Sequence, residues 1–358
     1  MVKKTQLKAI DFFCCGGGMT YGFQQAGIDV IAGIDIDPNC KETYELNNKP
    51  AEFIEADIKK LTETELIAKT GIQRNDDNLI FIGCSPCQYW SIIKTDKTKA
   101  KDSKNLLADF QRFVEYFNPG FVVIENVPGI FSKVESPFKV FMDFLADKGY
   151  YSRPHQIVKV SDYGVPQSRK RFVLIASRVR NLSFPKAIRD NTLTVRKFIG
   201  DENLFPNINQ GNNDETDYCH TTAGLKEISL KRLALTPIDG GTRKAWKDTD
   251  LQLEVYRNKD GVGNFSFKDS YGRLFWDKPA STITTKFFNI SCGRFAHPEQ
   301  NRAISIREGA TLQTFPSDYV FKAKSIADKS RLIGNAVPPE LARRIAQAII
   351  ESAENLTI

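Results

Sequence analysis

The sequence predicts an α/β protein built around a doubly wound, mostly parallel sheet. Up to about residue 180, short apolar runs alternate with stretches whose apolar residues recur at helical spacing, which is typical of repeated strand and helix units. A glycine-rich turn follows the first apolar run, where such sheets bind ligands. Strands are expected at residues 7–13, 29–34, 79–82, 121–125, 156–160 and 171–176, and helices at 20–26, 38–46, 62–70, 106–117 and 137–148.

The residue composition and the periodicity of the chain change beyond residue 180. Residues 203–222 are rich in Asn, Asp, Gly and Thr, and further turn-like segments follow. A proline pair then opens an amphipathic stretch that predicts a helix at 338–352. We therefore expect a first domain at residues 1–183, a second, smaller and irregular domain at 184–303, and a return to the first domain at 304–358.

Composition excludes several classes of protein. The hydrophobic content of 41% and the charged content of 26% are ordinary for a globular chain, and no apolar run approaches the roughly 18 residues of a membrane span. The N-terminus lacks a signal-peptide pattern, so the cytoplasm is the expected location. The 7 cysteines are scattered and odd in number, which predicts reduced thiols rather than a disulfide framework.

The turn after the first expected strand contains Gly16, Gly17 and Gly18 and leads into a helix, where backbone N–H groups can approach a ligand. The dinucleotide fingerprint is broken because Tyr21 stands at its third glycine. Acidic residues follow the next two units: the pair Asp35 and Asp37, about where a ribose-binding carboxylate belongs in nucleotide folds, and then Asp57. This pattern indicates an adenosine-containing ligand without a pyrophosphate, although an ordinary tight turn remains an alternative.

A thiol and a carboxylate are expected at the same edge of the sheet. Cys87 follows the strand at 79–82, where it could be a nucleophile, and Glu125 ends the strand at 121–125. A buried, protonated glutamate could hydrogen-bond a ring nitrogen. Three alternatives stay open on the residues alone: a redox pair of Cys84 with Cys87, an inert buried thiol, and a helix-capping acid.

Basic residues are concentrated between residues 153 and 180, in a chain whose net charge is +7. Such a stripe suits a polyanion, but a solvated charged face explains a basic segment equally well. Within it, Arg169 and Arg171 are two positions apart, so on a strand they would point to one face. Paired guanidinium groups there could hold a base carbonyl and a phosphate.

Taken together, these motifs resemble those of the bacterial cytosine-C5 DNA methyltransferases of restriction-modification systems, in the family's order. The matching segments are residues 11–18, Pro86-Cys87-Gln88, Glu125-Asn126-Val127, and residues 167–171, 307–316 and 334–339. The chain departs from the family pattern at Cys15, which replaces a glycine, and at Ser85, which replaces a common proline.

The resemblance implies an S-adenosylmethionine-dependent methyltransferase fold, with a catalytic first domain and a target-recognition second domain. It implies transfer of a methyl group from S-adenosylmethionine to C5 of a cytosine that is flipped out of a specific duplex DNA sequence. Cys87 would attack C6, Glu125 would hold N3, and Arg169 and Arg171 would assist, with Arg171 favoured for the base carbonyl. Double-stranded DNA is the expected partner of a monomeric enzyme, a separate restriction endonuclease is possible, and no metal is expected.

The same resemblance assigns the binding residues. Phe13 would pack on the adenine, Asp35 would hold the ribose hydroxyls, Asp57 would accept from the adenine amine, and Asn335 with Val337 would complete the cofactor wall. The remaining cofactor contacts would be Gly16, Gly17, Gly18, Ile36, Ile58 and Pro86. The DNA contacts would be Gln88, Ser91, Lys94, Arg243, Lys244 and Arg294, with phosphate contacts favoured over base readout for the last three.

Three rival functions are weighed against this one. A tRNA cytosine methyltransferase would share the nucleophile and acid motifs but is expected to have a shorter recognition region. A catalytically idle DNA-binding relative is disfavoured because nucleophile, acid and arginines are all present. An NAD-dependent oxidoreductase is disfavoured by the broken fingerprint at Tyr21.

Overall fold

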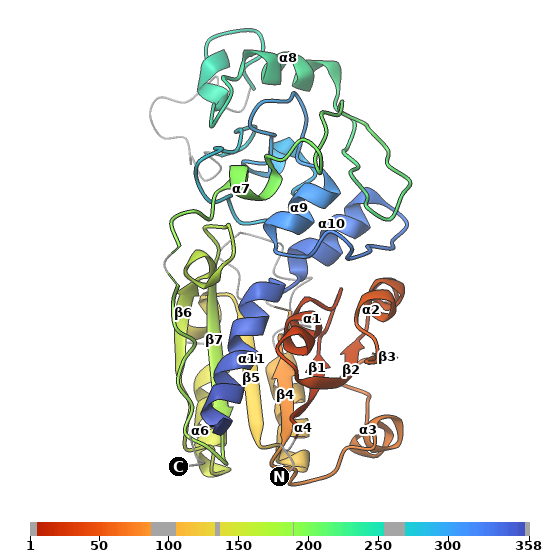
Figure 1. Cartoon of the computed structure of the whole chain (residues 1–358), viewed down its shortest axis with the longest axis vertical. Helices are drawn as coiled ribbons and strands as arrows, with labels where there is room; N and C mark the ends of the chain where they lie inside the picture. Colours follow the sequence, from red (N-terminus) through yellow and green to blue (C-terminus); the bar gives the residue numbers. More distant parts are fainter. Residues whose placement is uncertain (1–5, 87–104, 133–136, 189, 254–268, 355–358) are drawn as a thin grey trace. The chain divides into compact units, whose positions relative to one another are not determined.

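The computed structural model describes residues 6–86, 105–132, 137–188, 190–253 and 269–354. Within these ranges, seven strands form one sheet in the order β3-β2-β1-β4-β5-β7-β6 (Figure 1). Strands β1 to β5 pair in parallel, whereas β7 is antiparallel to both β5 and β6. The strands are β1 (Lys8–Phe12), β2 (Asp29–Asp35), β3 (Glu52–Glu55), β4 (Leu79–Gly83), β5 (Phe121–Asn126), β6 (His155–Lys159) and β7 (Lys170–Ser177).

Helices cover both faces of the sheet because alternate side chains of each strand point to opposite faces. Phe12 and Phe81 face a buried cluster with Phe110 of α4 and Phe141 of α6. On the other face Asp11 contacts α1, and the Tyr44 ring of α2 packs against the backbone of β2. The helices are α1 (Gly18–Gln25), α2 (Lys41–Asn47), α3 (Glu63–Thr70), α4 (Leu106–Phe117), α5 (Gly129–Ser132), α6 (Phe138–Asp147) and α11 (Pro339–Glu354), with 3-10 turns η1 (Pro38–Cys40) and η3 (Val160–Tyr163).

The last helix, α11, packs directly against α1 (Figure 1). A Cβ atom at Gly22 of α1 would lie 2.4 Å from the Pro339 oxygen and 2.5 Å from the Ala342 Cβ, so the absence of a side chain permits this close approach. The contact fixes α1, whose N-terminus follows the glycine-rich turn. No helix in the described ranges combines the length and apolar character of a membrane span.

The predicted α/β fold class is confirmed, with two differences in detail. The sequence pattern did not predict β3, because that strand has only four residues and both of its end residues are exposed glutamates. The sheet is also mixed, since β7 reverses direction beside β5. This reversal places the start of β7 at the same edge as the end of β5, with Asn126 paired to Phe172.

A second compact unit contains Gly164–Arg169 and Arg189–Asn335, and the first unit contains the remainder of the chain. This unit therefore continues past residue 303, where the sequence predicted its end. Its small core includes Leu233, Trp246 and Tyr271. Its helices are α7 (Val195–Ile199), α8 (Glu227–Leu235), α9 (Ile306–Leu312) and α10 (Ile326–Asn335), with 3-10 turns η4 (Arg243–Trp246) and η6 (Ile290–Cys292).

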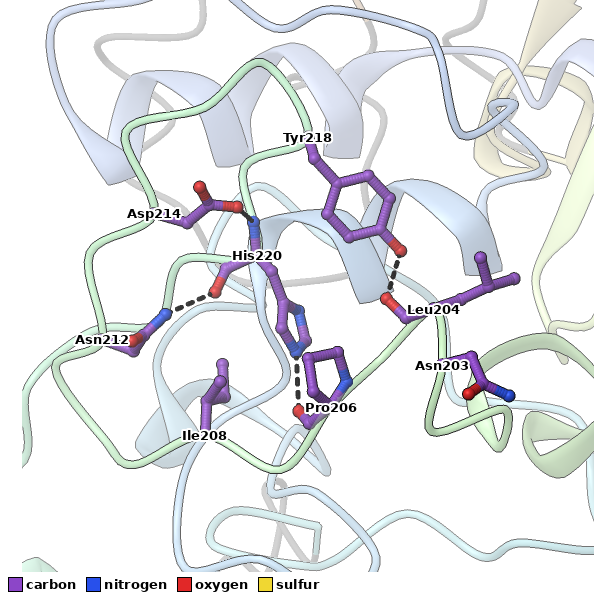
Figure 2. A pocket seen from close by; sticks show the side chains of 8 residues that line it. All are labelled: Asn203, Leu204, Pro206, Ile208, Asn212, Asp214, Tyr218 and His220. Atoms are coloured by element: carbon purple, nitrogen blue, oxygen red, sulfur yellow. Dashed lines mark hydrogen bonds between the residues drawn. The ribbon is translucent and has the colours of Figure 1, made fainter.

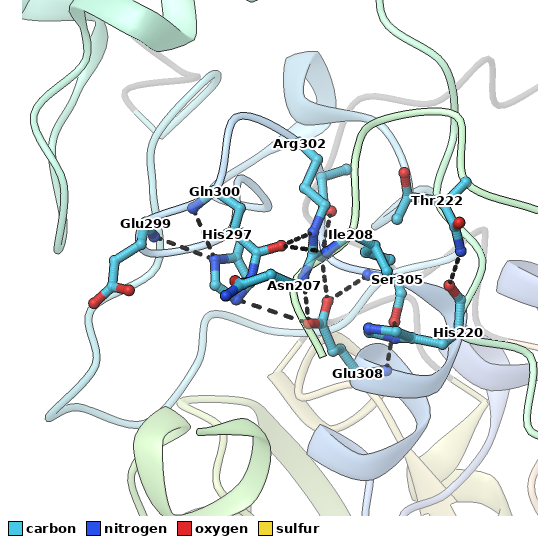
Figure 3. A network of polar contacts seen from close by, with 12 residues as sticks. Asn207, Ile208, His220, Thr222, His297, Glu299, Gln300, Arg302, Ser305 and Glu308 are labelled. Carbon is cyan, nitrogen blue, oxygen red and sulfur yellow. Dashed lines mark hydrogen bonds and ion pairs between the residues drawn. The ribbon is translucent and has the colours of Figure 1, made fainter. Parts of the chain in front are cut away.

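The second unit contains a buried ion pair within a network of polar contacts (Figure 3). Arg302 donates two hydrogen bonds of 2.7 Å to the two carboxylate oxygens of Glu308, and both residues are fully buried. Burial would raise the pKa of Glu308, but the adjacent Arg302 outweighs it and lowers that pKa to about 2. Ser305 caps α9 through the Glu308 N–H at 3.0 Å. The pair thus joins the start of α9 to the segment before it.

His297 completes this network as a neutral ring. Its Nδ1 accepts the Gln300 N–H at 3.0 Å, so the proton of the neutral ring is on Nε2, which lies 3.7 Å from Glu308. Burial lowers the pKa of His297 to about 3. The buried cluster therefore contains one full positive and one full negative charge near pH 7, held by Arg302 and Glu308.

Replacing Glu308 with Gln leaves the Arg302 charge buried without its counterion. We expect the free energy of unfolding to fall by about 3 kcal/mol or more, measured by urea denaturation. The control is Glu227→Gln, which removes one partner of the exposed Lys231 pair on α8 in the same unit and should leave stability unchanged. Equal, small effects from the two substitutions would contradict a structural role for the buried pair.

Candidate active site

The carboxyl ends of the parallel strands meet at one edge of the sheet in the first unit. Parallel pairing aligns Asp11 of β1 with Gly33 of β2 and Ile82 of β4. In the same way, Asp35 of β2 is paired with Glu55 of β3. The turns that follow β1 to β4, together with the end of β5, therefore lie along one edge, which is where open α/β sheets bind ligands.

The turn after β1 has a left-handed backbone at alternate positions. The φ angle is 65° at Phe13, 47° at Cys15 and 86° at Gly17. Helix α1 begins at the next residue, Gly18, with no side-chain cap on its first N–H groups. Cysteine thus adopts at position 15 the conformation that glycine adopts without strain. The turn directs the N-terminus of α1, with its partial positive charge, toward the edge of the sheet.

Asp35 joins this turn to the one after β2. Its Oδ2 accepts the Cys15 N–H at 2.9 Å, and its Oδ1 accepts the Asp37 N–H at 3.0 Å. Burial raises the pKa of Asp35, while these two N–H donors oppose the increase. Asp37 instead caps η1 through the Asn39 N–H at 3.0 Å. The structure therefore separates the two acids, with Asp35 at the edge of the sheet and Asp37 serving as a cap.

Below the turn, a buried acid anchors α1 to the sheet. Asp11 Oδ2 accepts the Thr20 hydroxyl at 2.8 Å, and the Thr20 oxygen lies 3.0 Å from the Tyr44 hydroxyl of α2. Burial raises the pKa of Asp11 to about 7, although the Thr20 hydrogen bond partly opposes it. Asp11, Thr20 and Tyr44 are all fully buried. This polar chain fixes α1 and α2 relative to β1.

The turn after β3 carries Asp57 and Ile58. Asp57 Oδ1 accepts the Lys59 N–H at 3.0 Å, and the Asp57 carbonyl accepts the Lys60 and Leu61 N–H groups. The Ile58 side chain is buried, whereas Ile36, which directly follows β2, is 64% exposed. Ile36 thus adds an exposed apolar side chain directly after Asp35 at this edge.

The segment after β4 is held by an asparagine of β5. Asn126 Nδ2 donates to the Ser85 carbonyl at 3.1 Å and lies 3.3 Å from the Ser85 hydroxyl, and both residues are buried. The serine that replaces a common proline therefore adds a polar contact here. Residues 85 and 86 lead directly to the predicted nucleophile. Cys87, Gln88, Ser91 and Lys94 lie outside the described residues.

The neighbouring thiol, Cys84, is a poor nucleophile. Burial raises its pKa well above the usual value, and the charges of Glu125 and Asp11 act in the same direction. Because only the thiolate is reactive, Cys84 stays protonated and inert near neutral pH.

Glu125 and Arg171 are paired at the same edge. Arg171 Nε lies 2.9 Å from Glu125 Oε1, and the two side chains are 14% and 9% exposed. The antiparallel pairing of β5 with β7 brings them together across the sheet. Arg171 also donates to the Lys170 carbonyl at 2.8 Å. A carboxyl group and a guanidinium group thus lie side by side at this edge.

The sequence matches the family model for C-5 cytosine-specific DNA methylases over residues 7–351. The chain belongs to this family. It is 40% identical over 357 residues to the Type II methylase M.HgiDII of Herpetosiphon aurantiacus. The alignment covers 97% of this chain and 96% of that protein. It is 30% identical over 365 residues to the Type II methyltransferase M1.HphI of Haemophilus parahaemolyticus, covering 98% and 88%.

The fold is also that of a solved methyltransferase. The structure of the Entamoeba histolytica methyltransferase EhMeth superposes with a TM-score of 0.66 at 16% identity, covering 98% of this chain and all of the other (100%). The family match and the 40% identical relative confirm the resemblance inferred from the motifs. The protein is a methyltransferase that modifies C5 of cytosine in DNA.

One predicted catalytic residue of this methylase has a different environment from the one expected. Arg169 precedes β7 and belongs to the second unit, so it does not share a strand face with Arg171. It is buried, and its Nη1 donates to the carbonyls of Ile283 and Gly334 at 3.1 and 3.2 Å. The expected pairing of two arginines on one strand is therefore wrong, because the strand starts one residue after Arg169.

Among the predicted DNA contacts, Arg294 also has internal partners. It donates to the Gly240 and Arg273 carbonyls at 3.0 and 2.9 Å and forms a 2.8 Å ion pair with Asp269. Its side chain is 13% exposed, and its guanidinium group is bonded within the second unit. Arg243 and Lys244 start η4 after the capping residue Thr242, and Lys244 is exposed.

The last motif is divided between the units. Asn335 ends α10 and is exposed, whereas Val337 is buried just before α11.

The second unit also contains a hollow of about 420 Å³ that no predicted residue lines (Figure 2). Its polar groups are bonded to one another: Tyr218 donates to the Leu204 carbonyl at 2.6 Å, and His220 Nε2 lies 3.1 Å from the Pro206 carbonyl. Asp214 accepts the His220 N–H at 2.7 Å. These contacts hold the 203–220 segment together.

The left-handed conformation of Cys15 gives a test of the turn. In ordinary backbone, alanine is more stable than glycine, but at φ of 47° the order should reverse. We expect Cys15→Gly to be more stable than Cys15→Ala by about 1 kcal/mol in urea denaturation. Both variants lose the thiol, so their difference isolates the backbone. An alanine variant as stable as the glycine variant would refute the left-handed turn.

Proposed function

We propose that this methylase transfers the methyl group of S-adenosylmethionine to a cytosine that has been rotated out of duplex DNA, using Cys87 as nucleophile. The observation that carries the proposal is the pairing of Glu125 with Arg171 at the sheet edge to which the Ser85-Pro86 segment leads. A stacked base cannot reach such an edge, so extrusion from the duplex is required.

The residues present fit an S-adenosylmethionine molecule. Asp35 and Asp57 stand at the ends of adjacent strands, and each Asp35 oxygen keeps a lone pair that can accept a ribose hydroxyl. Exposed Ile36, together with Phe13, offers an apolar surface for adenine, and Asp57 an acceptor for its amine. The N-terminus of α1, after Gly16 and Gly17, suits a carboxylate. Ile58, Pro86, Asn335 and Val337 remain proposed contacts.

When bound, S-adenosylmethionine supplies an electrophilic methyl group. Cytosine C5 is too weakly nucleophilic to accept it, so the protein must activate the ring. We infer that the Cys87 thiolate forms a bond to C6 while Glu125 hydrogen-bonds N3 and stabilises its protonated form. The electron density displaced by the new bond then accumulates at C5. After methylation, a solvent water takes the C5 proton, the electron pair of that C–H bond re-forms the C5–C6 double bond, and the bond from Cys87 to C6 breaks to regenerate the thiolate.

Arg171 is the proposed partner of the base carbonyl. Its guanidinium group already lies beside Glu125, so the two groups can hold adjacent atoms of one pyrimidine edge. Arg171 is favoured over Arg169 because Arg171 is paired with Glu125, whereas Arg169 is buried and donates to the carbonyls of Ile283 and Gly334. The positive charge of Arg171 also favours formation of the thiolate on a nearby cysteine.

The relatives support a biological role. Those quoted above are named Type II methylases, so we infer that this chain protects host DNA beside a restriction endonuclease that acts separately. We propose that one copy acts alone in the cytoplasm and that the second unit recognises the target sequence. Lys244 and Arg243 remain the proposed contacts there, with Gln88, Ser91 and Lys94 near the nucleophile.

Methyl transfer from labelled S-adenosylmethionine tests the substrate. We expect label in duplex DNA and none in tRNA, and we expect Cys87→Ser to abolish transfer while cofactor binding by calorimetry is unchanged. Label found only in tRNA would overturn the DNA assignment. Full activity of the serine variant would overturn the covalent scheme, because a hydroxyl is too weakly acidic to replace the thiolate.

A further inference from the structure

Arg112, in the middle of α4, is bonded to the turn that follows β3. Its Nη2 donates to the carbonyls of Ile58 and Leu61, both at 2.9 Å, and its Nη1 pairs with Glu63 at the start of α3. The guanidinium carbon also lies 4.3 Å from the centre of the Phe113 ring. All of these partners belong to the first unit.

These contacts join a helix on one face of the sheet to the turn that carries Asp57. The other supports of the turn are local bonds and buried side chains: its own N–H groups bond back to Asp57, α3 begins with the capping box of Thr62 and Glu65, and the Ile58 and Leu61 side chains lie in the hydrophobic core. Arg112 is thus a long-range side-chain donor to this segment, 54 residues from Ile58 in sequence. The planar fork of arginine lets one nitrogen donate to two carbonyls while the other pairs with Glu63, a span that the single nitrogen of a lysine ammonium does not cover.

We propose that Arg112 is a positioning residue for the adenosine end of the cofactor. By holding the Ile58 and Leu61 carbonyls, it fixes the direction of the Asp57 carboxylate and the neighbouring backbone without touching the cofactor itself. The inference rests on the proposed function, in which Asp57 accepts from the adenine amine. It predicts an effect on cofactor affinity that is separate from the chemical step, because Asp57 lies in the turn after β3 whereas Glu125 lies on β5.

The chain offers a closely matched control in Arg178. Its Nε donates to the Asn118 and Pro119 carbonyls at 3.1 and 3.2 Å, and it forms a 2.7 Å ion pair with Asp77. It therefore has the same kinds of partner as Arg112, namely two carbonyls and one carboxylate. Arg178 directly follows β7, whose end lies beside the start of β5. It is therefore at the edge of the sheet opposite the carboxyl ends of the parallel strands.

The test measures binding of S-adenosylhomocysteine by calorimetry and the kcat and KM of methyl transfer for Arg112→Ala, Arg112→Lys, Arg178→Ala and Asp57→Asn. We expect Arg112→Ala to raise Kd and the cofactor KM about tenfold, with kcat at saturating cofactor unchanged within about twofold. Arg112→Lys should fall between Arg112→Ala and the parent protein. Arg178→Ala should lower stability but leave Kd and KM unchanged.

Hydrogen exchange provides a readout that general destabilisation would not move selectively. In Arg112→Ala, the Lys60 and Leu61 amides, which donate to Asp57, should exchange faster than those of β4, and Arg178→Ala should not show this pattern. If Asp57→Asn raises Kd but Arg112→Ala does not, the positioning role is refuted while the proposed cofactor site stands. If Asp57→Asn also leaves Kd unchanged, the proposed cofactor site itself fails.

Discussion

Parallel pairing of β1 to β5 is the constraint on which the candidate site depends. Strands that run in one direction end at one edge, so residues far apart in sequence, from Phe13 to Glu125, come to lie along that edge. The antiparallel strand β7 adds to it from the other direction, because its start lies beside the end of β5. Arg171 and Glu125, which both lie on strands, thereby form an ion pair.

Backbone groups then fix the side chains along this edge. Asp35 accepts N–H groups from two successive turns, and Asn126 donates to the segment that leads to Cys87. In each contact, a side chain is hydrogen-bonded to a backbone group of a turn, and this bond orients the turn. Rigid orientation of this kind is what lets a catalytic site act without reorganising during the reaction. The buried hydrogen bond between Thr20 of α1 and Asp11 of β1 fixes the helix that follows the first of these turns.

The sequence predicted most of the first unit because its signals are local. Helix α4 has the predicted bounds of 106–117, and β1, β2, β4 and β5 are each within one residue of their predicted ends, since periodic apolar residues mark both kinds of element. Strand β3 and the reversal of β7 were not predictable in this way. A four-residue strand has too little pattern, and direction in a sheet is a property of pairing, which leaves no periodic trace.

Other features depend on contacts between distant segments. That Arg169 bonds to Ile283 and Gly334 cannot be inferred from its spacing to Arg171, and Arg112 carries no motif that marks it. The second unit has short helices and a buried Arg302 and Glu308 pair, so its order comes from polar contacts that no hydrophobic period reveals. Family membership, by contrast, followed from motif order, which does not depend on geometry.

The central claim is that Cys87 forms a covalent bond to the cytosine while Glu125 supports the ring. The most direct measurement uses duplex DNA in which cytosine carries fluorine at C5, together with S-adenosylmethionine. Fluorine cannot leave as a cation, so the bond to the enzyme should persist. We predict a denaturant-stable protein–DNA adduct whose attachment maps to Cys87 by mass spectrometry, and whose formation is slowed by Glu125→Gln. Attachment at another residue, or methylation of ordinary DNA with no adduct formed on the fluorinated duplex, would contradict the account.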